Sequence, residues 1–260
     1  MIVRKVAICS YAILLIGLNR DVTADQIGPF GFQRCIQIEI TRKQNRQIKR
    51  RLRRAREQGS DSARTASVIP VYFNIIQDSS LSNPASEDQI SAQMDVLNQA
   101  YSGSGYSFAL AGIQTVVDES WAIDLLAGSA EASEMKSTLR VGDAQSLNIY
   151  LTGLGGSLLG YATFPWDYAF NPGDDGIVML STTLPGGSAF RYDLGNTAVH
   201  EVGHWLGLFH TFQPGFGEAN GCGTQGDFVS DTPSERIPHY NCRRSDSCRR
   251  LPGRDPIRNF

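Results

Sequence analysis

Hydrophobic residues between positions 67 and 210 recur with two different spacings, which predict alternating strands and helices. Stretches rich in β-branched and aromatic residues are typical of strands. They predict strands at 68–76, 108–117, 147–151, 158–163 and 177–180. Apolar positions three and four apart are typical of amphipathic helices. They predict helices at 86–101, at 131–141 and from about 196 onward. Strands that alternate with helices in this way indicate an α/β lobe.

The regular pattern ends at Gly207, and the residues after it are rich in Gly, Pro, Asp and Ser, which predicts loops. Before position 67 the pattern is different again. Residues 42–56 contain nine Lys and Arg, with Ile48 and Leu52 four apart, so a helix is expected there. A solvated helix and a disordered tail both fit this composition. The small polar residues from Gly59 to Ser67 predict a linker.

The first 24 residues have the features of a secretory signal peptide. Arg4 and Lys5 precede an apolar stretch at 6–18, which is too short to span a bilayer comfortably. Small residues follow, and cleavage is expected after Ala24. A membrane anchor is the alternative. We therefore expect a secreted, extracellular protein with a signal peptide at 1–24, a basic pro-segment at 25–66 and a catalytic domain at 67–260.

Charge is distributed unevenly along the chain. The formal net charge is −2, but residues 1–66 hold 14 Lys and Arg against 5 Asp and Glu. Residues 67–260 hold the other 10 Lys and Arg and 21 Asp and Glu, a net charge of −11. An acidic main part argues against nucleic acid as a partner. No later segment is apolar enough to span a membrane, so no membrane contact is expected after signal cleavage.

Three of the four histidines lie within eleven residues, in the pattern H-E-x-x-H-x-x-G-x-x-H that begins at His200. Residues four apart share a helix face, so His200 and His204 can bind one zinc ion. Glu201 is placed to take a proton from a zinc-bound water. The alternative, an amphipathic helix with histidines on its polar edge, does not explain why histidines occupy only ligand positions.

The third histidine, His210, can reach the same ion only if the helix ends before it. In an unbroken helix it would lie roughly 9 Å along the axis from His204, at about 1.5 Å per residue. Glycine accepts the left-handed conformation that ends helices. Gly207 therefore predicts a turn that brings His210 to the metal.

The residues around this motif resemble the pappalysin family of metzincin zinc endopeptidases, especially its short secreted microbial and fungal members. The resemblance extends over residues 34–260 and is strongest at the motif. Its other matching segments are 155–165, Gly221-Cys222, Gly226-Asp227, Asp231-Thr232-Pro233, Asp246-Ser247-Cys248 and Asp255-Pro256-Ile257. It implies a metzincin-type zincin of the α/β (α+β) class, with a mixed sheet and helices in an upper lobe and a loop-rich, disulfide-bonded lower lobe.

The resemblance implies a secreted zinc endopeptidase that is made as a zymogen and hydrolyses an extended peptide or protein substrate. His200, His204 and His210 would be the zinc ligands, and Glu201 would act as general base and then as general acid. The segment 158–163 resembles the metzincin edge strand, to which an extended peptide can add. An ordinary edge strand is the alternative.

Cysteines and acidic residues after the motif add further expectations. Disulfides are expected in a secreted protein, and the resemblance pairs Cys222 with Cys248 and leaves Cys242 without a partner in this chain. Asp227, Asp231 and Thr232 are candidate ligands for a structural calcium ion, or they only form turns. His239 has no motif partner and is expected at the surface.

The missing methionine turn leaves more than one functional interpretation open. The methionine turn that the resemblance implies would follow Phe260, where the sequence ends. The alternatives to an active endopeptidase are therefore a catalytically inert secreted zinc-binding homologue lacking this turn, and a fragment that folds poorly.

Cys35 in the pro-segment is a candidate latency switch that would bind the zinc, although Ile36 follows it where the family has glycine. A spare thiol is the alternative.

Overall fold

The computed structural model describes residues 41–57, 67–214, 219–223, 227–229, 232–239 and 244–256. These residues form two compact units, which we describe separately. The first contains residues 67–208, and the second contains residues 41–57 and the described residues from 209 onward. The predicted signal peptide, Cys35, Asp231 and Cys242 lie outside the described residues. Within these ranges, no helix has both the length and the apolar composition needed to cross a membrane.

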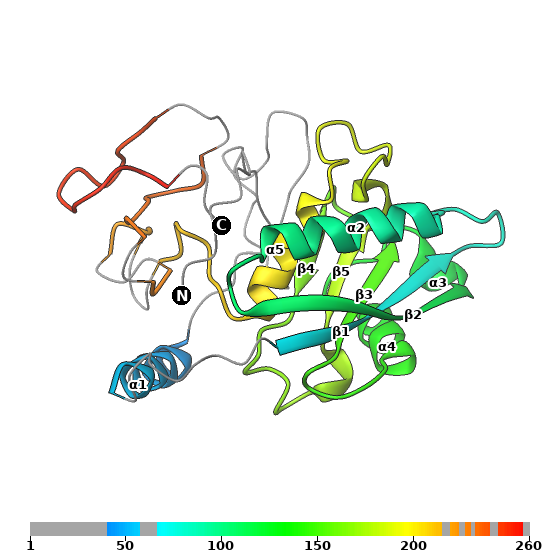
Figure 1. Cartoon of the computed structure of the whole chain (residues 1–260), viewed down its shortest axis with the longest axis horizontal. Helices are drawn as coiled ribbons and strands as arrows, with labels where there is room; N and C mark the ends of the chain where they lie inside the picture. The colour runs from blue at the N-terminus through cyan, green and yellow to red at the C-terminus, as the bar shows by residue number, and fades with distance from the viewer. Residues whose placement is uncertain are drawn as a thin grey trace. The chain divides into compact units, whose positions relative to one another are not determined.

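A five-stranded sheet forms the centre of the first unit (Figure 1). Its strands are β1 (Ser67–Gln77), β2 (Tyr106–Val117), β3 (Leu147–Thr152), β4 (Gly160–Ala162) and β5 (Ile177–Leu180). The strand order is β2-β1-β3-β5-β4. Strands β2, β1, β3 and β5 are parallel, whereas β4 pairs antiparallel with β5. The predicted mixed sheet is confirmed, and β4 is one of its two edge strands, shorter than the predicted 158–163.

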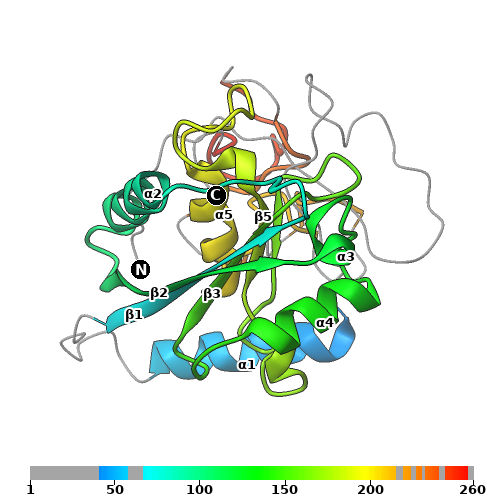
Figure 2. The same cartoon turned by 90° about the vertical axis from the view of Figure 1, so that its right-hand side faces the viewer.

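Helices cover both faces of this sheet (Figure 2). They are α2 (Glu87–Ala100), α3 (Glu119–Ala122), α4 (Ala130–Leu139) and α5 (Asn196–Trp205). Helices α2 and α5 lie on one face, and α4 lies on the other. Ser86 caps α2 in a capping box with Gln89, as its position before the apolar pattern predicts. Two short 3-10 helices, Pro172–Asp174 and Ser181–Thr183, complete the unit.

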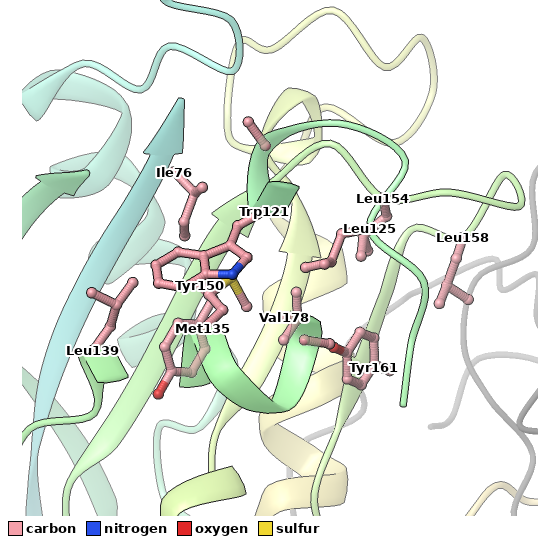
Figure 3. Close-up of a cluster of buried hydrophobic side chains, with 12 residues drawn as sticks. Ile76, Trp121, Leu125, Met135, Leu139, Tyr150, Leu154, Leu158, Tyr161 and Val178 are labelled. Carbon is pink, nitrogen blue, oxygen red and sulfur yellow. The ribbon is translucent and has the colours of Figure 1, made fainter. Parts of the chain in front are cut away.

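A hydrophobic core fills the space between the sheet and helices α3 and α4 (Figure 3). Its twelve buried residues are Ile76, Trp121, Ala122, Leu125, Ala132, Met135, Leu139, Tyr150, Leu154, Leu158, Tyr161 and Val178. Every residue of β3 is buried, because side chains alternate between two faces that are both covered by helices. Helix α5, which carries the motif, packs on β4 and β5 of this sheet.

The second unit contains one long helix, α1 (Arg42–Glu57), and otherwise turns and irregular segments among its described residues. The Thr41 side chain accepts from the Gln44 N–H, and the Gln44 side chain accepts from the Thr41 N–H, so a capping box starts α1. The predicted helix in the basic segment is therefore confirmed. The predicted disulfide between Cys222 and Cys248 is also present.

Candidate metal centre

Helix α5 carries the first part of the motif, and two hydrogen bonds hold it, one from α2 and one from the residue that follows α2. The Gln93 Nε2 donates to the Gly195 carbonyl at 3.0 Å, just before α5 begins. The Tyr101 hydroxyl donates to the Val199 carbonyl at 2.8 Å, next to His200. Both hydrogen bonds are buried, where water competes little with them. They therefore fix the position and orientation of α5.

A third attachment lies at the other end of α5 and uses the carboxylate of Asp175, which is almost fully buried. It accepts hydrogen bonds from the Trp205 indole N–H at 3.0 Å and the Thr163 hydroxyl at 3.1 Å. Its second oxygen pairs with the Arg140 guanidinium at 3.0 Å. Asp175 thus connects the end of α5 with the residue that directly follows the edge strand β4.

Helix α5 ends with the left-handed turn that Gly207 predicts. Gly207 has φ +97°, a conformation that disfavours every residue with a side chain. The Gly207 N–H donates to the His204 carbonyl, and the Leu208 N–H donates to the Gly203 carbonyl, both at 2.8 Å. This pair of bonds is the Schellman arrangement that terminates a helix. The predicted turn after His204 is confirmed.

The turn brings the three motif histidines together. One ring nitrogen of each of His200, His204 and His210 lies within 4.8 Å of the others, and among the described residues this is the only such cluster of three or more possible ligands. His204 and His210 are buried, and His200 is half-buried. Three imidazoles are a ligand set that suits zinc and leaves one position open. The structure therefore contains a three-histidine metal site.

The ring of His204 is prepared for metal binding. Its Nδ1 lies 2.8 Å from the Leu208 carbonyl, and because a carbonyl only accepts, Nδ1 carries the proton and Nε2 keeps a lone pair. Burial lowers the pKa of His204 to about 4, and the bond to Leu208 opposes this shift only in part. The ring is therefore neutral near pH 7, which is the form that binds a metal ion.

Glu201 is fully buried beside the edge strand. A Cβ placed on Gly160 in β4 would lie 2.9 Å from the Glu201 Cγ and 3.0 Å from its Oε1. Burial, and after it the negative charge of Glu201, raises the pKa of Tyr101. The carboxylate thus lies against the edge strand β4, on the helix that carries two of the three histidines.

Several residues that build this site were not among the sequence predictions. Gln93, Tyr101 and Asp175 act through contacts between distant parts of the chain, for which the sequence offers no local signal. Gly160 belongs to the glycine-rich segment that carries the resemblance, but its contact with Glu201 appears only in the folded chain.

The second unit contains His239 and Asp227, for which the sequence predicted a surface position and a possible calcium site. His239, expected at the surface rather than as a ligand, is half-buried: its side chain is 19% exposed and lies between two carboxylates. The Asp227 carboxylate accepts from the Val229 N–H at 2.9 Å, which is turn formation. Calcium binding by this segment stays a prediction.

Comparison with known proteins now connects this geometry to a family. The model of the peptidase M43 family, described as pregnancy-associated plasma protein-A, matches residues 186–251, which include the whole motif. An extracellular metalloprotease of Sordaria macrospora is 41% identical over 208 residues, 78% of this chain and 69% of that protein. Extracellular metalloprotease 1 of Coccidioides posadasii is 43% identical over 203 residues, 74% of this chain and 67% of that protein. The chain belongs to the M43 peptidase family.

Solved structures agree with this assignment. A promirolysin mutant of Tannerella forsythia matches with a TM-score of 0.59 and 26% identity, over 79% of this chain and 76% of that chain. Mature mirolysin in complex with a cleaved peptide matches with a TM-score of 0.53 and 29% identity, over 70% and 77% of the two chains. The predicted metzincin-type fold is thereby confirmed for this M43 peptidase.

Proposed function

We propose that this M43 peptidase is a secreted zinc endopeptidase. Three histidine nitrogens lie within 4.8 Å of one another beside a buried glutamate, and this arrangement carries the proposal. His200, His204 and His210 hold the metal, and Glu201 is the catalytic residue. The metalloproteases that it resembles are described as extracellular, which supports secretion of this chain as well.

Zinc, when bound, would polarise the scissile carbonyl and acidify the attacking water. Glu201 would take the proton from that water and deliver it to the leaving amine, which requires the carboxylate to be ionised at the start of the cycle. The neutral His204 ring supplies a lone pair for the metal without prior loss of a proton. Burial of Glu201 and His204 excludes bulk water, which strengthens each electrostatic interaction at the site.

An extended peptide is the substrate that the fold fits best. Strand β4 ends the sheet and pairs with β5 on one side only, so its outer edge can accept a peptide backbone as a further strand. Gly160 of this strand contacts Glu201, so a peptide aligned there would lie next to the proton-transfer group. The complex of mirolysin with a cleaved peptide, a structural relative, is consistent with this substrate class.

The precursor organisation completes the proposal. Residues 1–24 would act as a signal peptide and residues 25–66 as a pro-segment that is removed from the catalytic domain at 67–260. Structural calcium and a latency role for Cys35 are not needed for this proposal and stay predictions.

The test measures zinc content and cleavage of a denatured protein substrate with purified protein. We expect His200→Ala and His210→Ala to lose zinc, because each removes a ligand, whereas Glu201→Ala keeps zinc and loses cleavage. Zinc binding without Glu201-dependent cleavage would instead identify an inert zinc-binding homologue. Full zinc occupancy in His210→Ala would contradict the three-histidine site.

A further inference from the structure

The third histidine needs support that α5 does not supply. Helix α5 ends at Trp205, so His210 lies outside its ladder of backbone hydrogen bonds. Its ring stacks on Phe212 at 4.7 Å between centroids, and its carbonyl accepts from the Gln213 N–H at 3.0 Å. These two contacts lie within one turn of the chain. The next residue, Thr211, adds a contact with a more distant part of the second unit.

Thr211, the residue after His210, makes that contact. Its hydroxyl donates to Glu235 Oε2 at 2.5 Å, and both side chains are buried. The other oxygen of Glu235, Oε1, lies 2.6 Å from His239 Nδ1. Burial raises the pKa of Glu235, and the bonds from Thr211 and His239 act against this shift. Each carboxylate oxygen therefore has a strong hydrogen-bond donor, which a buried carboxylate requires.

The network continues to a second carboxylate. His239 Nε2 lies 3.6 Å from Asp255 Oδ2, so the ring is placed between two acidic groups. Asp255 accepts from the Ser247 N–H at 2.9 Å and from its hydroxyl at 2.8 Å. Ser247 precedes Cys248 of the disulfide. The four side chains of Thr211, Glu235, His239 and Asp255 are therefore linked to the covalent cross-link of the second unit.

The backbone around Glu235 is equally constrained. The Gly221 N–H donates to the Arg236 carbonyl at 3.1 Å. A Cβ on Gly221 would lie 2.0 Å from the Glu235 carbonyl oxygen and 2.6 Å from that of Phe212. Gly221 thus allows the segment after His210 and the segment of Glu235 to approach the same backbone position. Both the main chain and the side chain of Glu235 are therefore restrained by their contacts.

We propose that Glu235, held in place by His239, is the positioning residue for the third metal ligand, His210. The carboxylate binds the hydroxyl of the residue next to the ligand, so a shift of Glu235 moves the turn that presents the imidazole. Partners of metal-ligand segments have large effects on affinity, because zinc binds tightly only when its ligands are already placed. This inference rests on the proposed zinc site and extends it to Glu235 and His239.

The test measures zinc affinity by competition with a chromophoric chelator, so it does not depend on catalysis. Full-length Thr211→Val, Glu235→Ala, Glu235→Gln and His239→Phe are compared with the parent protein. Thr183→Val is the matched control, because Thr183 is also buried but its hydroxyl donates to the Leu180 carbonyl and not to a residue next to a proposed ligand. Thermal melting of the metal-free proteins shows whether each variant folds.

We expect Thr211→Val and Glu235→Ala to weaken zinc binding by about tenfold or more, and His239→Phe to weaken it by a smaller factor. Glu235→Gln should recover most of the affinity, because its amide can donate to Thr211 while its carbonyl accepts from His239. Thr183→Val should bind zinc as the parent does. If Glu235→Ala fails to fold, Thr211→Val decides, since it removes one hydroxyl at nearly constant volume.

Three results would overturn the inference in distinguishable ways. Parental zinc affinity in folded Thr211→Val and Glu235→Ala would make Glu235 a purely structural residue and leave the zinc site intact. An equal loss of zinc affinity in Thr183→Val would show that removal of any buried hydroxyl weakens zinc binding to the same extent. Failure of the parent protein to bind zinc would overturn the proposed function and this inference together.

Discussion

Among single residues, Gly160 has the most direct influence on the proposed catalytic group. A side chain at this position of β4 would meet the Glu201 Cγ at 2.9 Å, its Oε1 at 3.0 Å and the Thr197 Cγ2 at 3.1 Å. These distances are shorter than carbon atoms normally tolerate. The glycine therefore allows Glu201 to pack directly against the backbone of the edge strand, where a bound peptide would lie.

Gly160→Ala should lower kcat by about 10- to 100-fold, because even a small displacement of a proton-transfer group is costly. Zinc content should stay at the parental level, since the three atoms nearest to an added Cβ belong to Glu201 and Thr197 and not to a histidine. The measurement is steady-state cleavage of a peptide together with zinc analysis. Gly173→Ala is the control, because an added Cβ there comes no closer than 3.3 Å to any neighbour. An unchanged kcat in Gly160→Ala would show that Glu201 has room to move.

At the scale of elements, α5 depends on bonds from residues far away in the sequence. Gln93 and Tyr101 hold its beginning and middle, and Asp175 holds its end. The ten residues of α5 are too few for a stable helix in water by themselves. Tertiary hydrogen bonds therefore supply much of what keeps the ligands His200 and His204 in position.

Trp205→Phe should destabilise the protein by roughly 1.5–3 kcal/mol, because it removes the N–H that donates to the buried carboxylate of Asp175. Trp121→Phe is a closely matched control, since both tryptophans are buried and the Trp121 N–H has no hydrogen-bond partner in the structure as described. Urea denaturation of both variants measures the difference. Equal losses would indicate that packing of the indole, rather than its hydrogen bond to Asp175, decides stability.

At the scale of the whole molecule, the second unit has few regular elements and relies on a cross-link. The Cys222–Cys248 disulfide joins positions that are 26 residues apart. It lies next to Ser247, which binds Asp255. Segments with many turns bury little apolar surface, so a covalent restraint on the unfolded chain has a large relative effect there.

Replacing both cysteines, Cys222→Ala with Cys248→Ala, should lower stability by about 3–4 kcal/mol on the chain-entropy estimate for a loop of this length. Thermal unfolding with and without a reducing agent measures the effect. The double variant should melt earlier than the oxidised parent and should no longer respond to the reductant. A parental melting temperature in the double variant would mean that hydrogen bonds alone hold this segment.

Much of this protein could be predicted from its sequence, because those features are local. The spacing of apolar residues predicts β1, α2, β3 and β5 with bounds that differ from the observed ones by about one residue or less, and it predicts the start of α5. Ser86 predicts a capped helix because its side chain bonds a backbone group three residues away. The positions of the histidines and of Gly207 predict a three-ligand metal site, since helix geometry and the glycine conformation determine which rings meet.

What only the tertiary structure decided depends on contacts between distant residues. The order of the strands places β2 and β4 at the two edges of the sheet, and no local pattern encodes that order. The edge position of β4 is expected only from the family resemblance. Asp175 meets Trp205 across 30 positions, Gln93 meets Gly195 across 102, and Thr211 meets Glu235 across 24. His239 has no ligand spacing in the sequence, yet in the fold it lies between two buried carboxylates. A hydrogen bond of this kind forms wherever the folded backbone brings a donor and an acceptor together, so it leaves no periodic signal in the chain.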